Sequence, residues 1–528
     1  MAIRSGRDSR AIFAVQVDAG RSDGRLGIVH EMPVGPPRPA VHLLNRLHSS
    51  CGVSKPLDAT SFQHHLVFPE RSRARDLHTF TNECKITPNS WPFISMKLNN
   101  PRKKVLIVGG GVAGLTLATK LGDQLGRSGK AEITLVDRSP THIWKPMLHA
   151  LAAGTWDAQQ QQVSFLPHAS RHCFNFQPGD ICGLNRSSRT VTLAPFTLAS
   201  GEVVVEQRTL EYDVLVLAIG SRANDFGTPG VAEICHFIDS QVQADAFNEM
   251  LRARLLRCVV EKETLRVAIV GGGATGVELC AELSRLLDLA SNYGDNDLRQ
   301  RLHLTLIESA PRILAAFPER ISASSAEQLR NIGVDIHVDT RVVSAEPSGF
   351  RLGDGRLLPA ELMVWAAGVK AAEFLARLPD ISTTRSNQVI VRSTLQSEED
   401  PNIFAIGDCA SFVPTDGGKP LPPTAQVANQ QAEHLSRHLG QWLEGAALPP
   451  FVFRDMGALV SLSNYNAFGT LGKFGFFRGA FLQGSFAQAS HAFLYRRQQV
   501  GLHGLFRASL MWLAEALNKL VRPPIRLS

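Results

Sequence analysis

The sequence lacks the paired cysteines that mark zinc sites and disulfide-based enzymes. Its 8 cysteines are scattered over 528 residues, and none forms a C-x-x-C or C-x-x-x-x-C motif. This spacing predicts no metal site and no disulfide framework, and it argues against a disulfide reductase. Unpaired cysteines indicate a reducing compartment, the cytosol or the cytosolic face of a membrane.

Long hydrophobic runs are also missing. No stretch of about 18 apolar residues occurs, so the sequence predicts no membrane-spanning helix. The N-terminus has no apolar core of a secretory signal. The net charge of +7 is mildly basic, a balance that fits nucleic acid, an anionic cofactor or an anionic membrane face.

Residues 1–95 show scattered Arg and Pro, weak periodicity and no strand-turn-helix pattern. Their acidic residues, such as Asp8 and Asp18, argue against a transit peptide. From Met96 the chain reads "MKLNNPRKKVLIVGGG", a short basic segment that leads into an apolar strand. We therefore expect residues 1–95 to be a disordered extension or a mis-called start, with Met96 as the true first residue.

An internal duplication dominates the rest of the chain. The segment "KKVLIVGGGVAGLTLATKL" from Lys103 predicts a strand, a tight turn and a helix, and "LRVAIVGGGATGVELCAEL" from Leu265 repeats it. Continuous apolar strands indicate parallel sheets covered on both faces. Because the first pattern resumes near Val389, the sequence predicts an α/β fold with two Rossmann-like domains, the second inserted in the first.

Each repeat carries the glycine pattern of a dinucleotide-binding turn. The first glycine makes the turn, the second lets the backbone approach a diphosphate, and the third lets the helix pack on the strand. An acidic residue then ends the next strand, where it can bind a ribose. The residues are Gly109, Gly111, Gly114 and Asp137 in the first repeat, and Gly271, Gly273, Gly276 and Glu308 in the second.

Two nucleotide sites in one chain imply two nucleotides, and FAD with a pyridine nucleotide is the common pairing. The carboxylate of Glu308 would repel a 2′-phosphate, so NADH is favoured, although nearby Arg312 leaves NADPH open. We expect an FAD domain formed by residues 96–225 and 385–450, and an NADH domain over 226–384. The C-terminal region, 451–528, follows as a separate part.

From Lys103 to Ser528 the chain resembles the type II NADH dehydrogenases, the single-subunit NADH:quinone oxidoreductases that do not pump protons. The resemblance is carried by "HIWKPMLHALAAGTWD" from His142, by the second glycine turn, by "IFAIGDCA" from Ile403 and by "AQVANQ" from Ala425. The C-terminal tail is similar to the membrane-binding tail of the bacterial branch.

The resemblance implies roles for several further residues. Asp408 would contact the ribityl and diphosphate part of FAD, and Ala425 and Gln426 would lie against the flavin ring. Gln426 and Gln430, four residues apart on one helix face, would reach a quinone. Glu278 would orient the nicotinamide and handle protons. Lys145 and His149 could each lie near the flavin or be an ordinary loop residue, and Lys145 is counted among the residues expected to bind FAD. Cys409 is interpreted as a packing residue.

One position departs from the family. Many members have a lysine near the quinone, whereas this chain has Gln483 and Gly484 at the corresponding place. The residue that stabilises reduced quinone is therefore left open.

The tail has apolar residues at three- and four-residue spacing, which form one face of a helix. They are Leu502, Leu505, Phe506, Leu510, Leu513, Leu517, Leu520 and Val521. Such a helix could cover the core. Its basic flanks, among them Arg496 and Arg497, favour instead a helix that lies on an anionic membrane surface.

The resulting hypothesis is an enzyme that carries electrons from NADH through FAD to a membrane quinone, ubiquinone or menaquinone. It would be a peripheral protein on the cytoplasmic face of the inner membrane. We expect no nucleic acid as a partner, and a homodimer is possible. One rival is a sulfide:quinone oxidoreductase, for which no cysteine pair can be assigned. The others are another pyridine-nucleotide-dependent flavoprotein reductase and a non-enzymatic redox-sensing flavoprotein.

Overall fold

The computed structural model describes residues 102–157, 162–198, 200–291, 297–414, 418–463, 465–471 and 481–521. All belong to one of the two units into which the chain divides, Met96–Ser528. The expectations for residues 1–95 and for Met96 as the first residue lie outside the described residues.

The first domain is built on a parallel five-stranded sheet of strand order β22-β11-β1-β2-β5. The strands are β1 (Lys103–Val108), β2 (Ala131–Asp137), β5 (Asn175–Pro178), β11 (Val214–Leu217) and β22 (Ile403–Ala405). All four residues of β11 are buried, as continuous apolar strands of a covered sheet require. Because β22 comes from far along the chain and pairs with β11, the sheet closes only after the second domain is complete.

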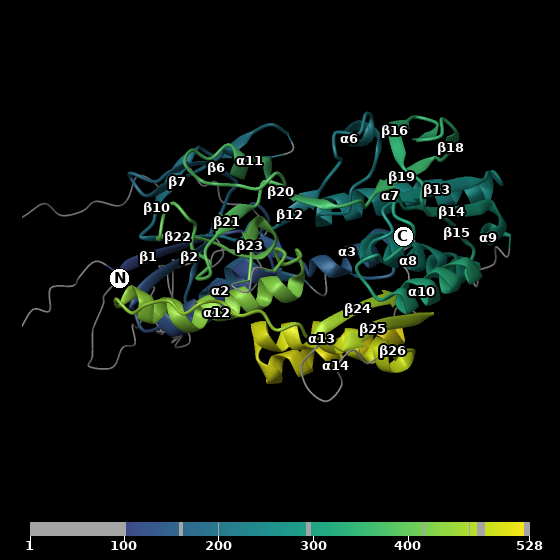
Figure 1. Ribbon diagram of the computed structural model, residues 1–528. Helices are drawn as coiled ribbons and strands as arrows, with labels where there is room; N and C mark the ends of the chain where they lie inside the picture. The colour runs from purple at the N-terminus through teal and green to yellow at the C-terminus, as the bar shows by residue number, and fades with distance from the viewer. Residues whose placement is uncertain are drawn as a thin grey trace, which may run out of the picture. The chain divides into compact units, whose positions relative to one another are not determined.

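Helices cover one face of this sheet and a small antiparallel sheet covers the other. Helices α2 (Val112–Leu121) and α12 (Ala425–Leu443) lie side by side (Figure 1). The small sheet has the order β10-β7-β6, with β6 (Ile181–Asn185), β7 (Thr190–Leu193) and β10 (Arg208–Glu211). Its buried Val191 and Leu193 belong to the same core as the strands of the large sheet.

The second domain repeats this plan between the first domain's strands β11 and β22. Its parallel sheet has the order β15-β14-β13-β19, with β13 (Leu265–Val270), β14 (Leu302–Ile307), β15 (Val334–His337) and β19 (Leu362–Trp365). One core is shared by three helices, α7 (Gln241–Val260), α8 (Ala274–Ser291) and α10 (Glu319–Asn331). The antiparallel sheet of this domain consists of β16 (Val342–Glu346), β17 (Gly349–Leu352) and β18 (Leu357–Pro359). The predicted α/β fold with two Rossmann-like domains, the second inserted in the first, is confirmed.

One short helix joins the two domains. Helix α3 (Leu148–Ala153) follows the first domain's β2 in the chain, yet it contacts α7 and α8 of the second domain. Its Leu148 and Leu151 are buried in the second domain's core. This packing brings residues of the "HIWKPMLHALAAG" segment to the first turns of α8.

The C-terminal region adds a three-stranded antiparallel sheet and two helices. The strands are β24 (Gly457–Leu462), β25 (Asn466–Leu471) and β26 (Phe481–Gln483), and the helices are α13 (Ser485–His503) and α14 (Leu505–Val521). Strand β24 packs on α8 and α13 packs on the sheet. None of the helices in the described ranges is long and apolar enough to cross a bilayer.

The predicted tail helix is interrupted. Gly504 has φ +76° and separates α13 from α14. Leu502, placed by sequence on the apolar face of the tail helix, ends up in α13 and is buried in the first domain's core. Backbone with φ +76° and ψ 161° is accessible essentially to glycine alone, so Gly504 is the signal in the sequence that marks this break.

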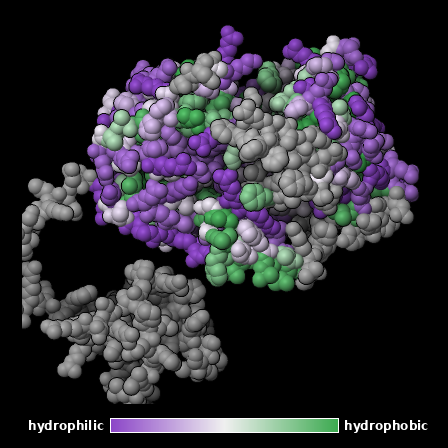
Figure 2. Space-filling view, turned by 60° about the horizontal axis from the view of Figure 1, so that its bottom comes forward, coloured by the Kyte–Doolittle hydropathy of each residue, from purple (hydrophilic) through white to green (hydrophobic). Residues whose placement is uncertain are grey.

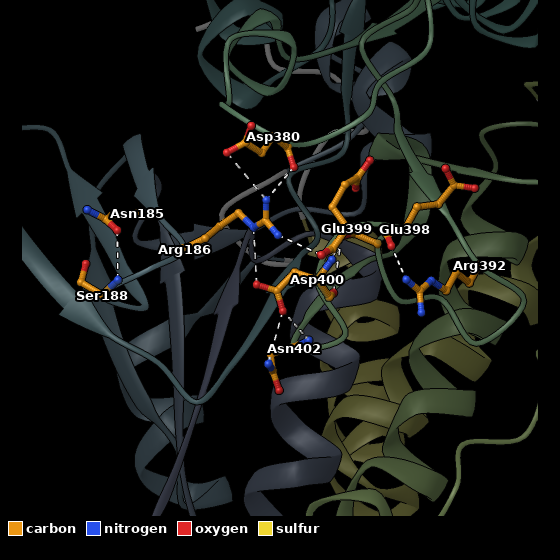
Figure 3. A network of polar contacts seen from close by, with 10 residues as sticks. Asn185, Arg186, Ser188, Asp380, Arg392, Glu398, Glu399, Asp400 and Asn402 are labelled. Carbon is orange, nitrogen blue, oxygen red and sulfur yellow. Dashed lines mark hydrogen bonds and ion pairs between the residues drawn. The ribbon is translucent and has the colours of Figure 1, made fainter.

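An arginine network fixes the chain where it returns to the first sheet (Figure 3). Arg186, on the β6–β7 hairpin, donates from Nη1 to the Asp380 carbonyl at 2.9 Å and from Nη2 to the Glu399 carbonyl at 2.8 Å. Its Nε lies 3.5 Å from the Asp400 carboxylate, which in turn accepts the N–H of Asn402 at 2.8 Å. The guanidinium thus holds both sides of the segment that leads into β22.

Replacing Arg186 by Met should remove these bonds and leave the part-buried Glu399 carbonyl and the Asp400 carboxylate without the guanidinium. The expected loss is about 1–3 kcal/mol of unfolding free energy, measured by denaturant unfolding. The exposed Arg189 on the same hairpin is the matched control. Equal stability of Arg186→Met and Arg189→Met would refute the clamp.

Candidate active site

The first glycine turn has three glycines in three different environments. Gly109 has φ +105°, and a Cβ there would lie 2.3 Å from the Ala218 carbonyl oxygen. A Cβ on Gly114 would lie 1.8 Å from the Gly109 carbonyl oxygen. A Cβ on Gly111, by contrast, would meet nothing within 4 Å. The first and third glycines are therefore required by packing, whereas the second leaves open space at the N-terminus of α2.

The second turn has the same geometry. Gly271 has φ +113°, and a Cβ there would lie 2.7 Å from backbone atoms of Ala366. A Cβ on Gly276 would lie 2.0 Å from the Gly271 carbonyl oxygen. A Cβ on Gly273 again meets nothing within 4 Å. Both open positions lie at helix N-termini, where free N–H groups and the helix dipole favour a diphosphate. The residues present thus fit two dinucleotides.

The two acidic residues at the strand ends are also equivalent. Asp137 accepts the N–H of Gly110 at 2.6 Å and that of Ser139 at 2.7 Å. Glu308 accepts the N–H of Gly272 at 2.6 Å and that of Ala310 at 2.8 Å. Burial raises the pKa of Asp137 above its usual range, although the two N–H donors oppose this. Each carboxylate is fixed beside its glycine turn, where a ribose can reach it.

A cleft of about 1720 Å³ brings most of the predicted site residues together. It is lined by Gly109, Gly111, Asp137, Lys145, Glu278, Asp408, Ala425 and Gln426. Gly114, Gly271, Gly273, Gly276, Glu308 and Gln430 do not line it. The cleft therefore runs from the first glycine turn to the first turns of α8 and α12, and it leaves the second glycine turn outside.

Asp408 lies in a single turn after β22 and is held by residues from two other segments. Its carboxylate accepts the Ser221 hydroxyl at 2.6 Å, and its carbonyl accepts the side-chain amide of Gln388 at 3.0 Å. Lys145 donates from Nζ to the Ser221 carbonyl at 2.9 Å. Ser221 and Gln388 were missed by sequence reasoning, because only the folded chain brings them to Asp408.

Gln431 is a second residue that sequence reasoning missed. It is 1% exposed, and its Oε1 accepts the N–H of Gly407 at 2.7 Å. Gly407 has φ +73° and precedes Asp408. The side chain of Gln431 thus fixes the turn that presents Asp408 to the cleft. A polar residue on the buried face of α12 was the signal that could have revealed it.

Glu278 is a buried acid at the cleft. It is 7% exposed, accepts the Ser461 N–H at 3.1 Å, and has its Oε2 3.5 Å from His149 Nδ1. The pKa of Glu278 is raised to about 8, mainly by burial and also by the nearby Glu282, while the Ser461 hydrogen bond opposes the rise. His149, left open by the sequence, lines the cleft with it.

The two glutamines of the "AQVANQ" motif have different surroundings. Thr424 caps α12 by accepting the Val427 N–H at 3.3 Å, and this places Gln426 in the first turn, at the cleft. Gln430 instead pairs with the backbone of Arg454, accepting its N–H at 3.0 Å and donating to its carbonyl at 2.8 Å. The structure thus holds Gln430 on the segment that precedes β24.

Cys409 is buried, and its Sγ donates to the carbonyls of Leu217 and Ile406. Burial raises the pKa of its thiol to about 11. Because a thiolate is the reactive form of cysteine, this thiol is inert at neutral pH, in line with its interpretation as a packing residue.

Two dinucleotide turns in one chain, with a long cleft that runs from the first turn to Glu278 of the second domain, define a class, the flavoprotein oxidoreductases that take electrons from a pyridine nucleotide. Residues 103–432 match the family model described as pyridine nucleotide-disulphide oxidoreductase.

Two named relatives indicate the branch of this family to which the chain is similar. The chain is 40% identical over 444 residues to the type II NADH:quinone oxidoreductase of Haemophilus influenzae, a match that covers 80% of this chain and 100% of that protein. It is 28% identical over 376 residues to the enzyme of the same name from Staphylococcus aureus, covering 70% and 89%.

Solved structures support the fold. The NDH2 structure from Plasmodium falciparum in complex with NADH has a TM-score of 0.69 at 19% identity, covering 80% of this chain and 100% of that one. The sulfide:quinone oxidoreductase of Aquifex aeolicus has a TM-score of 0.61 at 19% identity, covering 79% and 95%.

The chain belongs to the type II NADH:quinone oxidoreductases. This membership confirms the resemblance inferred from the sequence, together with FAD and NADH as the nucleotides used.

The equivalence of the two glycine turns gives a crossed test. Gly111→Ala should fold normally, because its Cβ meets open space, but should lose bound FAD, because the methyl group occupies the path of the diphosphate. Gly273→Ala should retain FAD and require a higher NADH concentration for half-maximal flavin reduction. Bound flavin absorbance and NADH titration measure the two effects, and each variant controls for the other. Loss of FAD in both variants, or in neither, would contradict the assignment.

Proposed function

We propose that this chain passes two electrons from NADH through FAD to a quinone at the cleft, while the protein lies on the cytoplasmic surface of a membrane. The observation that carries the proposal is the cleft itself, which joins the first glycine turn to Glu278 of the second domain and to Gln426 of α12. Bound FAD supplies the acceptor for the hydride of NADH and the donor to the quinone.

The first domain holds FAD in this proposal. Free N–H groups at the N-terminus of α2 bind the diphosphate, and Asp137 accepts from the adenosine ribose. Asp408, with Lys145 and Ser221 behind it, fixes the middle of the cofactor. The open N-terminus of α12 at Ala425 directs its helix dipole at the flavin end of the cleft.

The second domain selects NADH. Glu308 is fixed at the end of β14, where its charge opposes a 2′-phosphate. The sequence left NADPH open because of Arg312. That guanidinium donates to the Phe317 carbonyl at 2.9 Å and the Ala315 carbonyl at 2.9 Å, so it is engaged with its own loop. This supports a preference for NADH over NADPH.

Quinone binds beside Gln426 in this proposal. The amide of Gln426 makes one long hydrogen bond of 3.4 Å, to the Arg454 carbonyl, and can turn to a quinone oxygen. Gln430 contributes indirectly, because its two bonds to Arg454 hold the facing segment in place. The side chain of Gln483, at the place where the family has a lysine, lies outside the described part of the structure.

Helix α14 supports a membrane location. Its outward face carries Leu505, Phe506, Leu510, Leu513 and Leu517, each between 51% and 77% exposed. A helix that covers the core would bury this face. Here the opposite face does the packing: Ala508 is fully buried, and Trp512 donates to Gln499 of α13 at 2.7 Å.

Polar contacts hold α14 in this orientation. Arg496 of α13 pairs with Glu515 at 2.6 Å and lies over the ring of Trp512, 5.3 Å from its centroid. The face turned forward in Figure 2 shows hydrophobic residues gathered along one edge of a largely hydrophilic surface. Arg497 and Arg507 are exposed and lie close in the chain to the apolar face of α14. Each could add about 1 kcal/mol to the free energy of binding to an anionic leaflet.

Quinone reduction should depend on Gln426. Gln426→Leu should slow quinone-dependent NADH oxidation roughly 5- to 30-fold, the effect of losing about 1–2 kcal/mol of hydrogen bonding. The rate at which NADH bleaches the flavin should not change. Gln441→Leu, at an exposed position of the same helix, is the control. Equal slowing of both half-reactions in Gln426→Leu would argue against a quinone contact.

Membrane binding should depend on the exposed face of α14. Leu513→Glu should weaken binding to anionic vesicles by roughly tenfold or more, because burial of a leucine contributes about 1.5–3 kcal/mol. Leu256→Glu is the matched control, since Leu256 on α7 is 63% exposed and Leu513 is 58% exposed. Vesicle co-sedimentation measures the effect. Unchanged binding of Leu513→Glu would exclude this face as the membrane contact.

A further inference from the structure

Helix α7 carries apolar side chains on both of its faces. The inward face belongs to the second domain's core, with Ala244, Phe247, Leu251, Leu255 and Cys258 buried there. The outward face has large apolar side chains in solvent, among them Leu256 at 63% and Val260 at 69% exposure. A surface helix that packs on one side alone has polar residues on the other. Apolar side chains that gather on the outer face of a helix mark a contact surface.

The exposed residues of this face form one stripe. They follow one another at steps of three and four residues, the spacing of a single helix face. The stripe consists of Ala246, Glu249, Met250, Ala253, Leu256, Arg257 and Val260, all of them exposed. It has a small residue at its centre, and it includes one acid and one base.

The stripe has the same positions in both directions from Ala253. Glu249 lies four residues before Ala253 and Arg257 lies four residues after it. When two such helices cross in opposite directions with Ala253 at the crossing point, Glu249 of each copy comes opposite Arg257 of the other. Opposite charges across a contact fix its orientation, whereas like charges oppose it. Parallel packing would place each Glu249 opposite its own copy, so the charges select the antiparallel arrangement.

The sizes of the side chains also suit this arrangement. Ala246 and Val260 lie seven residues on either side of Ala253, so a small side chain of one copy comes opposite a larger one of the other. An alanine at the crossing point lets two helices approach to the roughly 8–10 Å between axes that packed helices have. The resulting contact obeys a two-fold axis, the commonest symmetry of homodimers.

A bilayer is a poorer partner for this stripe. The outward face of α14 presents five large apolar side chains, whereas the stripe on α7 has alanine at its centre and a glutamate one turn away. An anionic leaflet repels a carboxylate, and alanine offers little apolar area to bury. Figure 1 shows α7 apart from α13 and α14. The stripe is therefore a surface separate from the face proposed to meet the membrane.

We propose that α7 docks on the α7 of a second copy of this chain, antiparallel and about a two-fold axis at Ala253. This inference is independent of the proposed electron transfer, because no residue of the stripe lines the cleft. A contact made by one helix from each copy is small, below roughly 1,200 Å² in total, which is typical of weak association. We expect a dissociation constant of roughly 1–100 μM.

Cross-linking tests the geometry in the full-length, FAD-loaded protein. Ala253→Cys places two thiols at the axis, so a short bismaleimide should join two copies. Ala246→Cys is the matched control, an exposed alanine of the same stripe whose two copies would lie about 20 Å apart along the helices and should not be joined. A mixture of Ala246→Cys and Val260→Cys should be joined. Wild type under the same treatment accounts for the native cysteines, of which Cys182 is exposed.

A charge exchange tests the pairing of Glu249 with Arg257. Glu249→Arg and Arg257→Glu should each weaken association roughly tenfold or more, because each change brings like charges together twice in a two-fold contact. The double variant, Glu249→Arg with Arg257→Glu, should restore it. Sedimentation velocity measures association, and flavin absorbance shows that each variant is folded. Rescue by the double variant is a result that a merely structural role of either residue would not produce.

Leu256→Glu separates this surface from the membrane face. It should abolish association of copies, whereas Leu513→Glu should retain it. Binding of Leu256→Glu to anionic vesicles, measured below the dissociation constant of the pair, should match wild type, because each copy keeps its own α14. Loss of vesicle binding under these conditions would assign the stripe to the membrane and overturn the proposal.

Three further results would overturn it. The first is wild type that stays monomeric at about 500 μM, well above the expected dissociation constant. The second is cross-linking of Ala246→Cys as efficient as that of Ala253→Cys. The third is association that neither Leu256→Glu nor the single charge changes weaken, which would show that copies meet through another face.

Discussion

The whole site depends on one close contact, the approach of a helix to the turn before it. In each domain the third glycine lies so near the carbonyl of the first that a Cβ would be 1.8 Å or 2.0 Å away. This contact draws the N-termini of α2 and α8 against the ends of β1 and β13. In each domain, free N–H groups and an adjacent carboxylate therefore face the open space beside the turn. This is the arrangement that suits a phosphate.

The insertion of one domain into the other brings Glu278 of the second domain to the cleft of the first. Strand β22 returns to the first sheet after the second domain and delivers Asp408, while α3 reaches into the second domain's core and delivers His149. The Arg186 network and the Gln431 bond to Gly407 hold the returning segment. As a result, the cleft of the first domain ends at Glu278 of the second, which is the arrangement that the proposed hydride transfer between two bound nucleotides requires.

Much of this could be predicted from the sequence because the determining interactions are local. Gly109 and Gly271 need positive φ, and their strand-turn-helix context is contiguous in the chain, so both turns and both acids were predicted. The partners of Asp408 and the surroundings of Gln430 were not predicted. Spacing places Gln426 and Gln430 on one helix face, yet only tertiary packing turns Gln430 toward Arg454. The break at Gly504 and the burial of Glu282 likewise depend on packing against distant segments.

If one flavin links the two substrates in sequence, anaerobic mixing will separate its reduction by NADH from its oxidation by quinone. The FAD-loaded protein is mixed with one equivalent of NADH while the flavin absorbance is followed, and a soluble quinone analogue is then added. We expect loss of the oxidised flavin band on mixing with NADH and its return when quinone is added, with one quinol formed per NADH. A flavin that is not bleached by NADH, or that stays bleached when quinone is added, would contradict it.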